Sequence, residues 1–504
     1  MELKVFKDTL AAAGGCYDAK AELLVETEIL IPDYLPQVFK IVKCFVSLVV
    51  LQKQILNGRI TLDGYLRCTV CYQAEEEQSL CQTEQKLPFT RTIDLAPAQA
   101  GDGQIQVGGE VEYLNCRAVN QRRIDVRGAY ALNLRLVCMA AQEVVTAVAD
   151  CGAEQKTALL SGIRPAANLD KLITCEEEAA FPETPAAVLD IAGVGLVEEV
   201  KVISGKAVVK GKIQTRVLYR TGPGYQLETL RREVPFNHIV DLENVGEDCT
   251  CFAAVEPVGC TLMAGQEGQT SLSVSALLHL RAWRRVECYG VADAFSTRYE
   301  LKETRQTVTM EQLAANLDEL VETSVAGTLP DENAELLQCF VTLSPLELTE
   351  AGGCVQLRGR AMAHLLCMNS LGESDCYDKA FEYTLPYTLE GGESGRYRAE
   401  CWAAPAQVSW SRTGGEVTVK ASIQVTGLVM QRQTVSILSD LACGDPLERP
   451  DPEVALRIYY AKKGETLFDI AKRYHVSPNT IQQCNRLEEP ALEQDMRLLV
   501  PMVV

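Results

Sequence analysis

The sequence predicts a mainly β protein with three tandem antiparallel, sandwich-like β repeats and a small C-terminal βααβ domain. Two observations lead to this fold class. Strand-like segments recur with a period near 147 residues, and one compact helical stretch, YAKKGETLFDIAKRYHVSPNTIQQCNRL, lies near the C-terminus at residues 460–487. Apolar residues make up 47% of the 504 residues, enough for several packed cores.

The threefold repeat rests on three aligned segments: LNGRITLDGYLRCTVCY from Leu56, ISGKAVVKGKIQTRVLY from Ile203 and AGGCVQLRGRAMAHLLC from Ala351. Each segment carries two glycines with the same spacing, and the first glycine recurs after 147 and then 148 residues. Such self-similarity at a fixed period is typical of a repeated domain. The glycine pairs are Gly58 and Gly64, Gly205 and Gly211, and Gly353 and Gly359.

Alternating polarity within the repeats predicts strands with one buried face. Val417, Val419 and Ala421 alternate with polar residues, and turn-forming glycines at 414–415 precede them. We expect helical periodicity only in short connecting stretches, such as residues 313–317.

Five segments follow from the period and from a proline-rich stretch near the C-terminus. We expect β repeats at residues 1–150, 151–300 and 301–445, a mobile linker at 446–457 and a small domain at 458–504.

The charge of the chain argues against two classes of partner. Its net charge is −20 and its pI about 4.8, so it should repel nucleic acid and anionic membranes. The first twenty residues have no long apolar segment, and the longest mainly apolar run is residues 45–51. We therefore expect no secretory signal, no membrane insertion and a cytoplasmic location.

The 20 cysteines are expected to be reduced thiols, and no metal or cofactor is expected. Cys68 and Cys71 form a CxxC, but strand positions i and i+3 point to opposite faces, which is poor for chelation. No second CxxC or histidine pair follows, and the four histidines (238, 279, 364 and 475) are far apart. Because GxSxG, HExxH and kinase-like motifs are also lacking, we expect no enzyme.

The C-terminal stretch reads as strand, helix, helix, strand. Residues 458–461 form a short strand. Thr466 is placed to cap a helix whose inner face is Leu467, Ile470, Ala471 and Tyr474. Ser477 and Pro478 begin a second helix, and residues 498–500 form the closing strand.

This pattern resembles the LysM domain over residues 458–501. The departures from the family pattern are Ala461, Glu465 and Asp495. The matching positions are Tyr459, Gly464, Thr466, Leu467, Ile470, Ala471, Tyr474, Val476, Ser477, Asn485, Leu487, Leu498, Val500 and Pro501.

The repeats resemble the SPOCS domain of clostridial spore coat assembly proteins, through the glycine-rich signature at Gly205–Tyr219. SPOCS-like repeats followed by one LysM domain are similar to the SipL-like family of spore coat morphogenetic proteins. The resemblance implies a non-enzymatic scaffold in the mother-cell cytoplasm, at the forespore surface. It also implies that the LysM domain docks the coat basement ATPase, stage IV sporulation protein A, and that other coat proteins bind the chain.

The resemblance to LysM domains also implies a candidate site. LysM domains as a class bind N-acetylglucosamine polymers in a groove between two loops, so peptidoglycan binding and cell-wall anchoring form the alternative function. Loop residues 486–495 carry four acids and one base, which favours a basic protein surface over an anionic wall. Thr466, Leu467 and Asn485 also have structural interpretations. By position the groove residues are Gly464, Glu465, Thr466, Leu467, Asn485, Arg486 and Leu487.

Phe468 follows the core position Leu467 and is a further candidate for partner binding. An aromatic side chain beside a groove is typical of an interface anchor. The alternative is that Phe468 packs against the linker or against a β repeat.

Overall fold

The computed structural model confirms the predicted fold class: it consists mainly of antiparallel strands, with two short helices near the C-terminus. No helix in the described part of the chain is long and apolar enough to cross a membrane. The structure describes residues 3–75, 79–95, 103–221, 227–243, 245–264, 270–351, 354–390, 396–448, 454–487 and 492–502.

The first of three β units has two three-stranded sheets that face each other. A short sheet has the order β2-β3-β4, and a long sheet, which contains the first and last strands of the unit, has the order β1-β6-β5. Fully buried side chains from β3 and β6, such as Ile60 and Ile124, meet between the sheets. The strands are β1 (Lys4–Leu30), β2 (Val38–Leu56), β3 (Arg59–Ala74), β4 (Leu80–Asp94), β5 (Gly103–Asn120) and β6 (Arg123–Ala149).

The second unit repeats this topology, with a short sheet β10-β9-β8 and a long sheet β11-β12-β7 around its own core. Its strands are β7 (Ala153–Glu178), β8 (Pro185–Ile203), β9 (Lys206–Thr221), β10 (Leu227–Asp241), β11 (Cys249–Ala264) and β12 (Thr270–Ser296).

The third unit repeats the topology with one change. Its first short-sheet strand is divided into β14 and β15, which both pair with β16; Pro345, which has no N–H to donate, lies in the break. The predicted alternation is present in β19, where Val417, Val419 and Ala421 are buried. The strands are β13 (Tyr299–Thr328), β14 (Glu335–Leu343), β15 (Glu347–Ala351), β16 (Cys354–Met368), β17 (Ser374–Glu390), β18 (Tyr397–Thr413) and β19 (Glu416–Pro446).

One local expectation is wrong. Residues 313–317 are not helical but lie within β13, where they pair with β19. A register shift between Leu313 and Ala315 disturbs the alternation there, which explains why the sequence pattern is not strand-like.

The repeat glycines occupy equivalent places in the units. Gly58 and Gly205 have positive φ (71° and 78°) in the β2–β3 and β8–β9 turns, while Gly353 lies outside the described residues. The second glycines, Gly64, Gly211 and Gly359, lie on the central strands β3, β9 and β16, where a Cβ would collide with the neighbouring strand. The exact domain boundaries stay a prediction.

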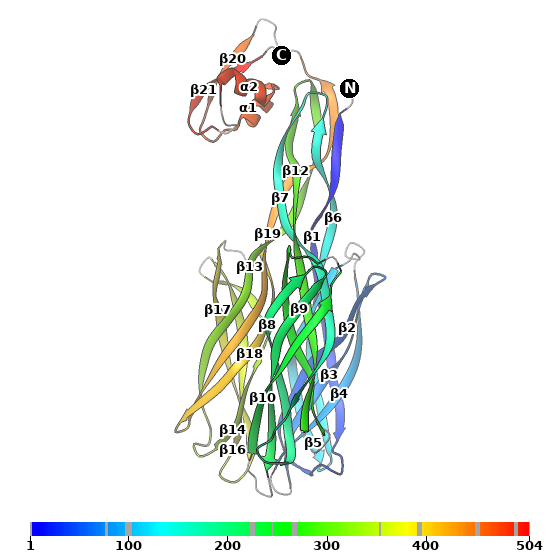
Figure 1. The fold of residues 1–504 in the computed structure, drawn as a ribbon, viewed down its shortest axis with the longest axis vertical. Coiled ribbons are helices and arrows are strands. Elements are labelled where there is room, and N and C mark those ends of the chain that lie inside the picture. The colour runs from blue at the N-terminus through cyan, green and yellow to red at the C-terminus, as the bar shows by residue number, and fades with distance from the viewer. Residues whose placement is uncertain are drawn as a thin grey trace.

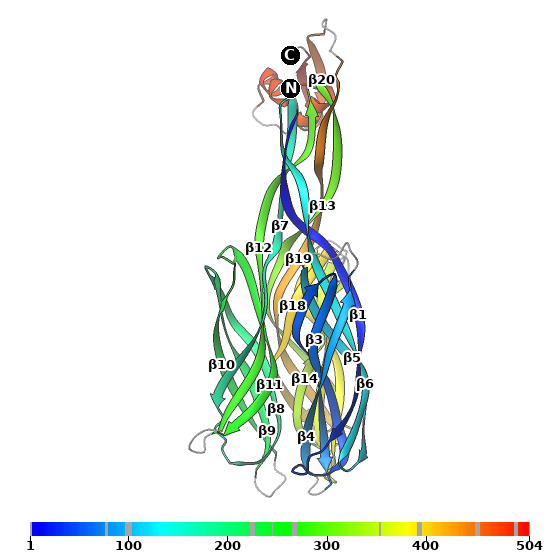
Figure 2. The same cartoon turned by 90° about the vertical axis from the view of Figure 1, so that its right-hand side faces the viewer.

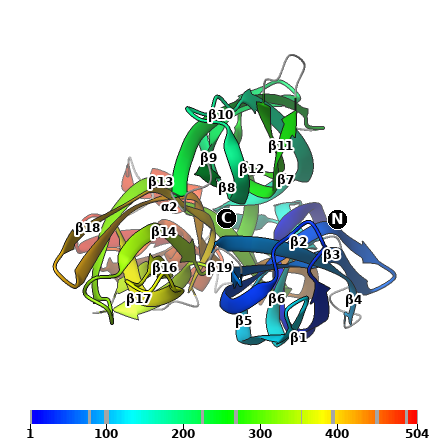
Figure 3. The ribbon, with the colours of Figure 1, turned by 90° about the horizontal axis from the view of Figure 1, so that it is seen from below.

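The three units stand around a common axis, and their longest strands continue beyond them as a stalk (Figures 1 and 3). Strands β1, β6, β7, β12, β13 and β19 form this stalk (Figure 2). The stalk has an apolar interior of its own. Leu10 of the first unit, Leu160 of the second and Val308 of the third are all buried in it. The distal end, called the tip here, contains the β6–β7 and β12–β13 turns and the end of β19.

A buried charge network joins the units. Glu400 on β18 accepts a hydrogen bond from the Gln104 amide of the first unit at 2.6 Å and lies 3.6 Å from the Arg281 guanidinium of the second. Beside it, Arg398 and Glu311 form a two-point ion pair with N–O distances of 2.6 and 3.1 Å. Their side chains are only 3% and 4% exposed, so this pair is a buried one.

We predict that Arg398→Met will lower the free energy of unfolding by roughly 3–5 kcal/mol, because it leaves the Glu311 carboxylate buried with a poorer partner. Urea unfolding of the full chain measures the change. The control is Arg59→Met, which removes a surface pair with Asp94 and should change stability little. An equal loss of unfolding free energy in the two variants would contradict the claim that the buried ion pair matters more than the exposed one.

We also predict that the network loses stability in acid. Burial would raise the pKa of Glu311, but the hydrogen bonds and charges of Arg398 and Arg432 outweigh it and hold the pKa below its ordinary 4.5. A lowered carboxyl pKa adds stability above pH 4.5 that is lost as pH falls through the folded pKa. The difference in unfolding midpoint between wild type and Glu311→Gln should therefore shrink between pH 7 and pH 3; a constant difference would argue against this linkage.

Candidate binding site in the C-terminal module

The C-terminal module consists of a two-stranded sheet and two helices. Its elements are β20 (Leu456–Ala461), α1 (Leu467–Tyr474), α2 (Pro478–Asn485) and β21 (Met496–Pro501), the predicted order, although β20 begins two residues earlier than expected. Leu467, Ile470 and Ile481 from the helices and Leu498 from the sheet form its core. Phe295 of β12 belongs to the same cluster, so the module packs against the tip.

Local hydrogen bonds set the ends of the helices. The Thr466 hydroxyl accepts a hydrogen bond from the Asp469 backbone N–H at 3.2 Å and donates one to the Asp469 carboxylate at 2.6 Å, the cap predicted from the sequence. Ser477 stands at the start of α2, but its side chain makes no capping hydrogen bond. Pro478, whose fixed φ suits the first helical turn, marks that start.

The two predicted groove loops meet. The Gly464 N–H donates to the Leu492 carbonyl at 2.9 Å, and the Leu492 N–H donates to the Glu465 carbonyl at 3.3 Å. Gly464 has a φ of 90°, which favours glycine. Residues 488–491, which hold two of the four acids of the second loop, lie outside the described residues.

Several of the predicted groove residues hold the module together. Leu467 is buried in the core, and Leu487 packs against it. The Asn485 side chain bonds both the N–H and the carbonyl of Leu499, at 2.8 and 2.7 Å, and so ties α2 to β21. Gly464 and Arg486 are exposed and are therefore the most accessible residues of the groove, while Thr466 is partly exposed, as are Glu465, Asn485 and Leu487.

Glu465 also has a structural role. Its carboxylate accepts hydrogen bonds from the Lys462 backbone N–H at 2.9 Å and from the Tyr459 hydroxyl at 2.8 Å. These hydrogen bonds lower the pKa of Glu465 below its ordinary value. The carboxylate thus closes the β20–α1 turn.

Phe468 packs against a β repeat, one of the two alternatives set by the sequence. Its ring meets the ring of Phe295 edge to face, with centroids 5.3 Å apart, and the Lys156 ammonium lies 5.9 Å from its centroid. Both neighbours belong to the second β unit at the tip. A role of Phe468 in binding a partner stays a prediction.

Polar contacts complete the attachment of α1 to the tip. The Lys472 ammonium lies 2.6 Å from Asp293 and 3.4 Å from Glu303, and His475 Nδ1 lies 3.1 Å from the Ser296 carbonyl. These groups come from the second and third β units, so the module bridges the β12–β13 turn.

Sequence reasoning missed an exposed apolar face on the module. Leu456, Ile458 and Tyr460 alternate along β20 with side chains 51%, 56% and 74% exposed. Leu499 lies opposite Ile458, and Arg497 lies opposite Tyr460, so all five side chains share one face of the sheet. We call these five residues the sheet face. The alternation of large apolar residues at 456, 458 and 460 is the signal that could have revealed it.

The CxxC cysteines do point apart, as strand alternation requires. Cys68 is fully buried between the sheets of the first unit, whereas Cys71 lines a cavity on the other side of β3. Cys249 and Cys251 both pack against the core of the second unit.

One His/Cys/Asp group is brought together from distant positions, which sequence reasoning also missed. Among the described residues, His364, Cys376 and Asp378 have potential ligand atoms within 4.8 Å of one another. The Asp378 carboxylate bonds His364 Nδ1 at 2.8 Å and pairs with Lys43 of the first unit, while His364 Nε2 lies 2.9 Å from the Thr342 hydroxyl. These contacts make the group a polar bridge between the first and third units, and the Lys43 charge opposes a cation there.

Comparison with known families identifies two kinds of domain. The family model described as "SipL, SPOCS domain" matches residues 37–119 and 186–263, and the LysM domain model matches residues 459–501. No curated protein and no solved structure matches the chain. The chain thus has the domain content of the SipL-like family. This is the domain content of a sporulation-related protein with a LysM binding module. The third β unit lies outside the matched segments but repeats the sheet topology of the first two.

We predict that Phe468→Ala will loosen the module from the tip, because the aromatic pair with Phe295 contributes about 0.5–1.5 kcal/mol beyond its buried area. Carbodiimide cross-linking of Lys156 to Asp469, whose charged atoms lie 3.6 Å apart, should lose yield several-fold. The Lys4–Asp150 pair at 3.0 Å within the stalk is the internal control and should keep its yield. An unchanged Lys156–Asp469 yield would count against Phe468 as an attachment residue.

Proposed function

We propose that this SPOCS- and LysM-containing chain is a non-enzymatic scaffold of the spore coat, and that its LysM domain docks a coat protein at the forespore surface. The partner we propose is the coat basement ATPase, stage IV sporulation protein A, with other coat proteins binding the β units. The site of action is then the mother-cell cytoplasm.

The sheet face is the observation that supports docking of a protein. It offers a contiguous set of exposed apolar side chains, with Tyr460 at 74% exposure and Arg497 directly across from it. Tyrosine and arginine are among the residue types that are enriched at the energetic centres of protein interfaces. Burial of this face against a partner would remove apolar surface from water, which favours association.

The place of the LysM domain agrees with this function. Helix α1 is occupied by its contacts with the tip, through Phe468 and Lys472, while the side chains of the sheet face remain exposed. A partner can therefore reach the sheet face without displacing the domain from the tip.

The competing function is binding of N-acetylglucosamine polymers in the groove. Its support is the LysM match and the hydrogen bonds between Gly464 and Leu492, which hold the two groove loops together. Against it, several groove residues, among them Leu467 and Asn485, are committed to the fold of the domain.

We predict that Tyr460→Ala will weaken binding of the coat ATPase to the full chain by about 1–3 kcal/mol, or roughly 5- to 150-fold in Kd. Isothermal titration calorimetry gives the Kd. Tyr289→Ala is the matched control: this tyrosine is 62% exposed but lies on β12 in the second unit, and its loss should leave the affinity unchanged.

The same calorimetric assay separates the two functions. Chitooligosaccharides titrated into the full chain should give negligible heat, because we assign the binding energy to the sheet face. Saturable glycan binding that is lost in Arg486→Ala but kept in Tyr460→Ala, with no heat from the ATPase, would support the cell-wall function instead.

A further inference from the structure

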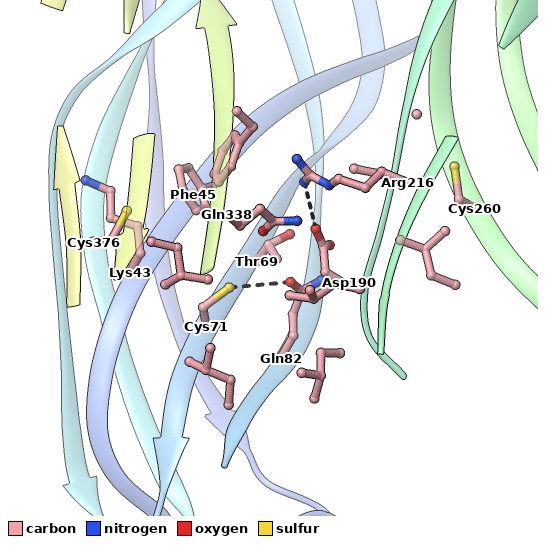
Figure 4. Close-up of a pocket in the computed structure, with 18 of the residues that line it drawn as sticks. Lys43, Phe45, Thr69, Cys71, Gln82, Asp190, Arg216, Cys260, Gln338 and Cys376 are labelled. Atoms are coloured by element: carbon pink, nitrogen blue, oxygen red, sulfur yellow. Dashed lines mark hydrogen bonds and ion pairs between the residues drawn. The ribbon is translucent and has the colours of Figure 1, made fainter. Parts of the chain in front are cut away.

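The three β units together line a partly open cavity near the axis around which they stand. Its volume is about 230 Å³, and its walls come mainly from the short sheets of all three units. Figure 4 shows Cys71, Asp190 and Gln338, one from each unit, around the same space. The cavity is smaller than the pockets of about 300–1,000 Å³ that hold drug-sized ligands, so it suits a small molecule.

The repeat explains why the space is there. Phe45, Ala192 and Phe340 are equivalent, since they are spaced by the repeat period and pair with Thr69, Arg216 and His364 on the central strands. The two phenylalanine rings meet each other with centroids 5.4 Å apart. The second unit contributes only the methyl group of Ala192 at this position, and the missing ring leaves a gap beside the axis.

The polar residues of the cavity leave hydrogen-bond donors unused. Two residues before the aromatic position, the three units carry Lys43, Asp190 and Gln338. Lys43 pairs with Asp378, and Asp190 pairs with Arg216 at 3.1 Å. Gln338 is only 7% exposed, and its amide nitrogen has no hydrogen-bond partner among the described residues. The same holds for Arg216 Nε. A buried donor without a partner is costly, so a bound acceptor would be favoured.

The charge of the walls also favours an acceptor that carries negative charge. Three cationic side chains, Lys43, Arg67 and Arg216, line the cavity together with one carboxylate, that of Asp190; the carboxylates that pair with Lys43 and Arg67, those of Asp378 and Glu84, do not line it. Three thiols of the wall add no negative charge, because burial raises the pKa of Cys71 and of Cys376 to about 12 and that of Cys260 to about 11. Most of the remaining wall is apolar, with Leu218, Pro257 and Phe340 among its residues, and Ser47, Thr69 and Gln82 add polar groups.

We propose that this axial cavity binds a small organic carboxylate. The carboxylate group accepts hydrogen bonds from the Gln338 amide and from Arg216 Nε, and the apolar part of the ligand occupies the gap beside Ala192. Because the walls come from three units, the ligand contacts each of them and stabilises their assembly.

Benzoate is the probe for this site, and benzyl alcohol, of similar size but without the carboxylate, is its control. Calorimetric titration of the full chain should give saturable binding of benzoate with one site per chain, and much weaker binding of benzyl alcohol. Gln338→Met keeps the size of the side chain but removes the donor, and should raise the Kd for benzoate roughly tenfold or more. Gln356→Met, on β16 away from the cavity wall, should not change it.

Ala192→Phe tests the space itself. It restores the ring that the first and third units carry, so it should abolish benzoate binding; circular dichroism and thermal unfolding check that it folds. If this variant does not fold, the proposal is tested by the Kd for benzoate of Gln338→Met compared with that of Gln356→Met. Absence of saturable benzoate binding, equal binding of benzyl alcohol, or a Kd unchanged in Gln338→Met would each overturn the proposal.

Discussion

The arrangement of the three β units depends on charges buried where they meet. Glu400 of the third unit contacts Gln104 of the first and Arg281 of the second, and Arg398 beside it lies over the Trp283 ring of the second unit, 5.3 Å from its centroid. Buried ions are tolerated only with good partners in fixed positions. A sliding or rotation of one unit would separate these groups, so the network specifies one relative placement where an apolar contact alone would allow many.

That placement has two results. It brings the outer faces of the short sheets together around the axial cavity, and it aligns the long strands so that their ends combine in the stalk. The stalk in turn supplies Phe295 and Asp293, to which the LysM domain attaches. The proposed docking surface is thus held at a defined end of a long body and not on a free tether.

Sequence reasoning found the local features of the fold. The alternation around Val419 and the cap at Thr466 predicted strand and helix correctly, because both depend on residues close in sequence. The spacing of Gly64, Gly211 and Gly359 predicted the repeat, because a central strand that leaves no room for a side chain recurs in each unit.

It did not find features that depend on pairs distant in the chain. Lys43 and Asp378 are 335 residues apart, and no local pattern marks them as partners. The packing of Phe468 on Phe295 and the gap left by Ala192 likewise depend on how the units are arranged in space, which no local sequence pattern reveals. The strand at residues 313–317 was missed because a bulge interrupts its alternation.

Both ends of each unit lie at the tip, and this suggests how the threefold chain could arise in evolution. The first and last strand residues of each unit are paired neighbours: Lys4 with Ala149, Ala153 with Ser296, and Tyr299 with Pro446. A gene duplication that copies one whole unit therefore adds a body whose two ends already lie side by side, and the chain re-enters the next unit across a turn of a few residues. Three copies complete the circle around the axis, and afterwards each copy could diverge at its axial positions, as Lys43, Asp190 and Gln338 have done, without any change to the path of the backbone.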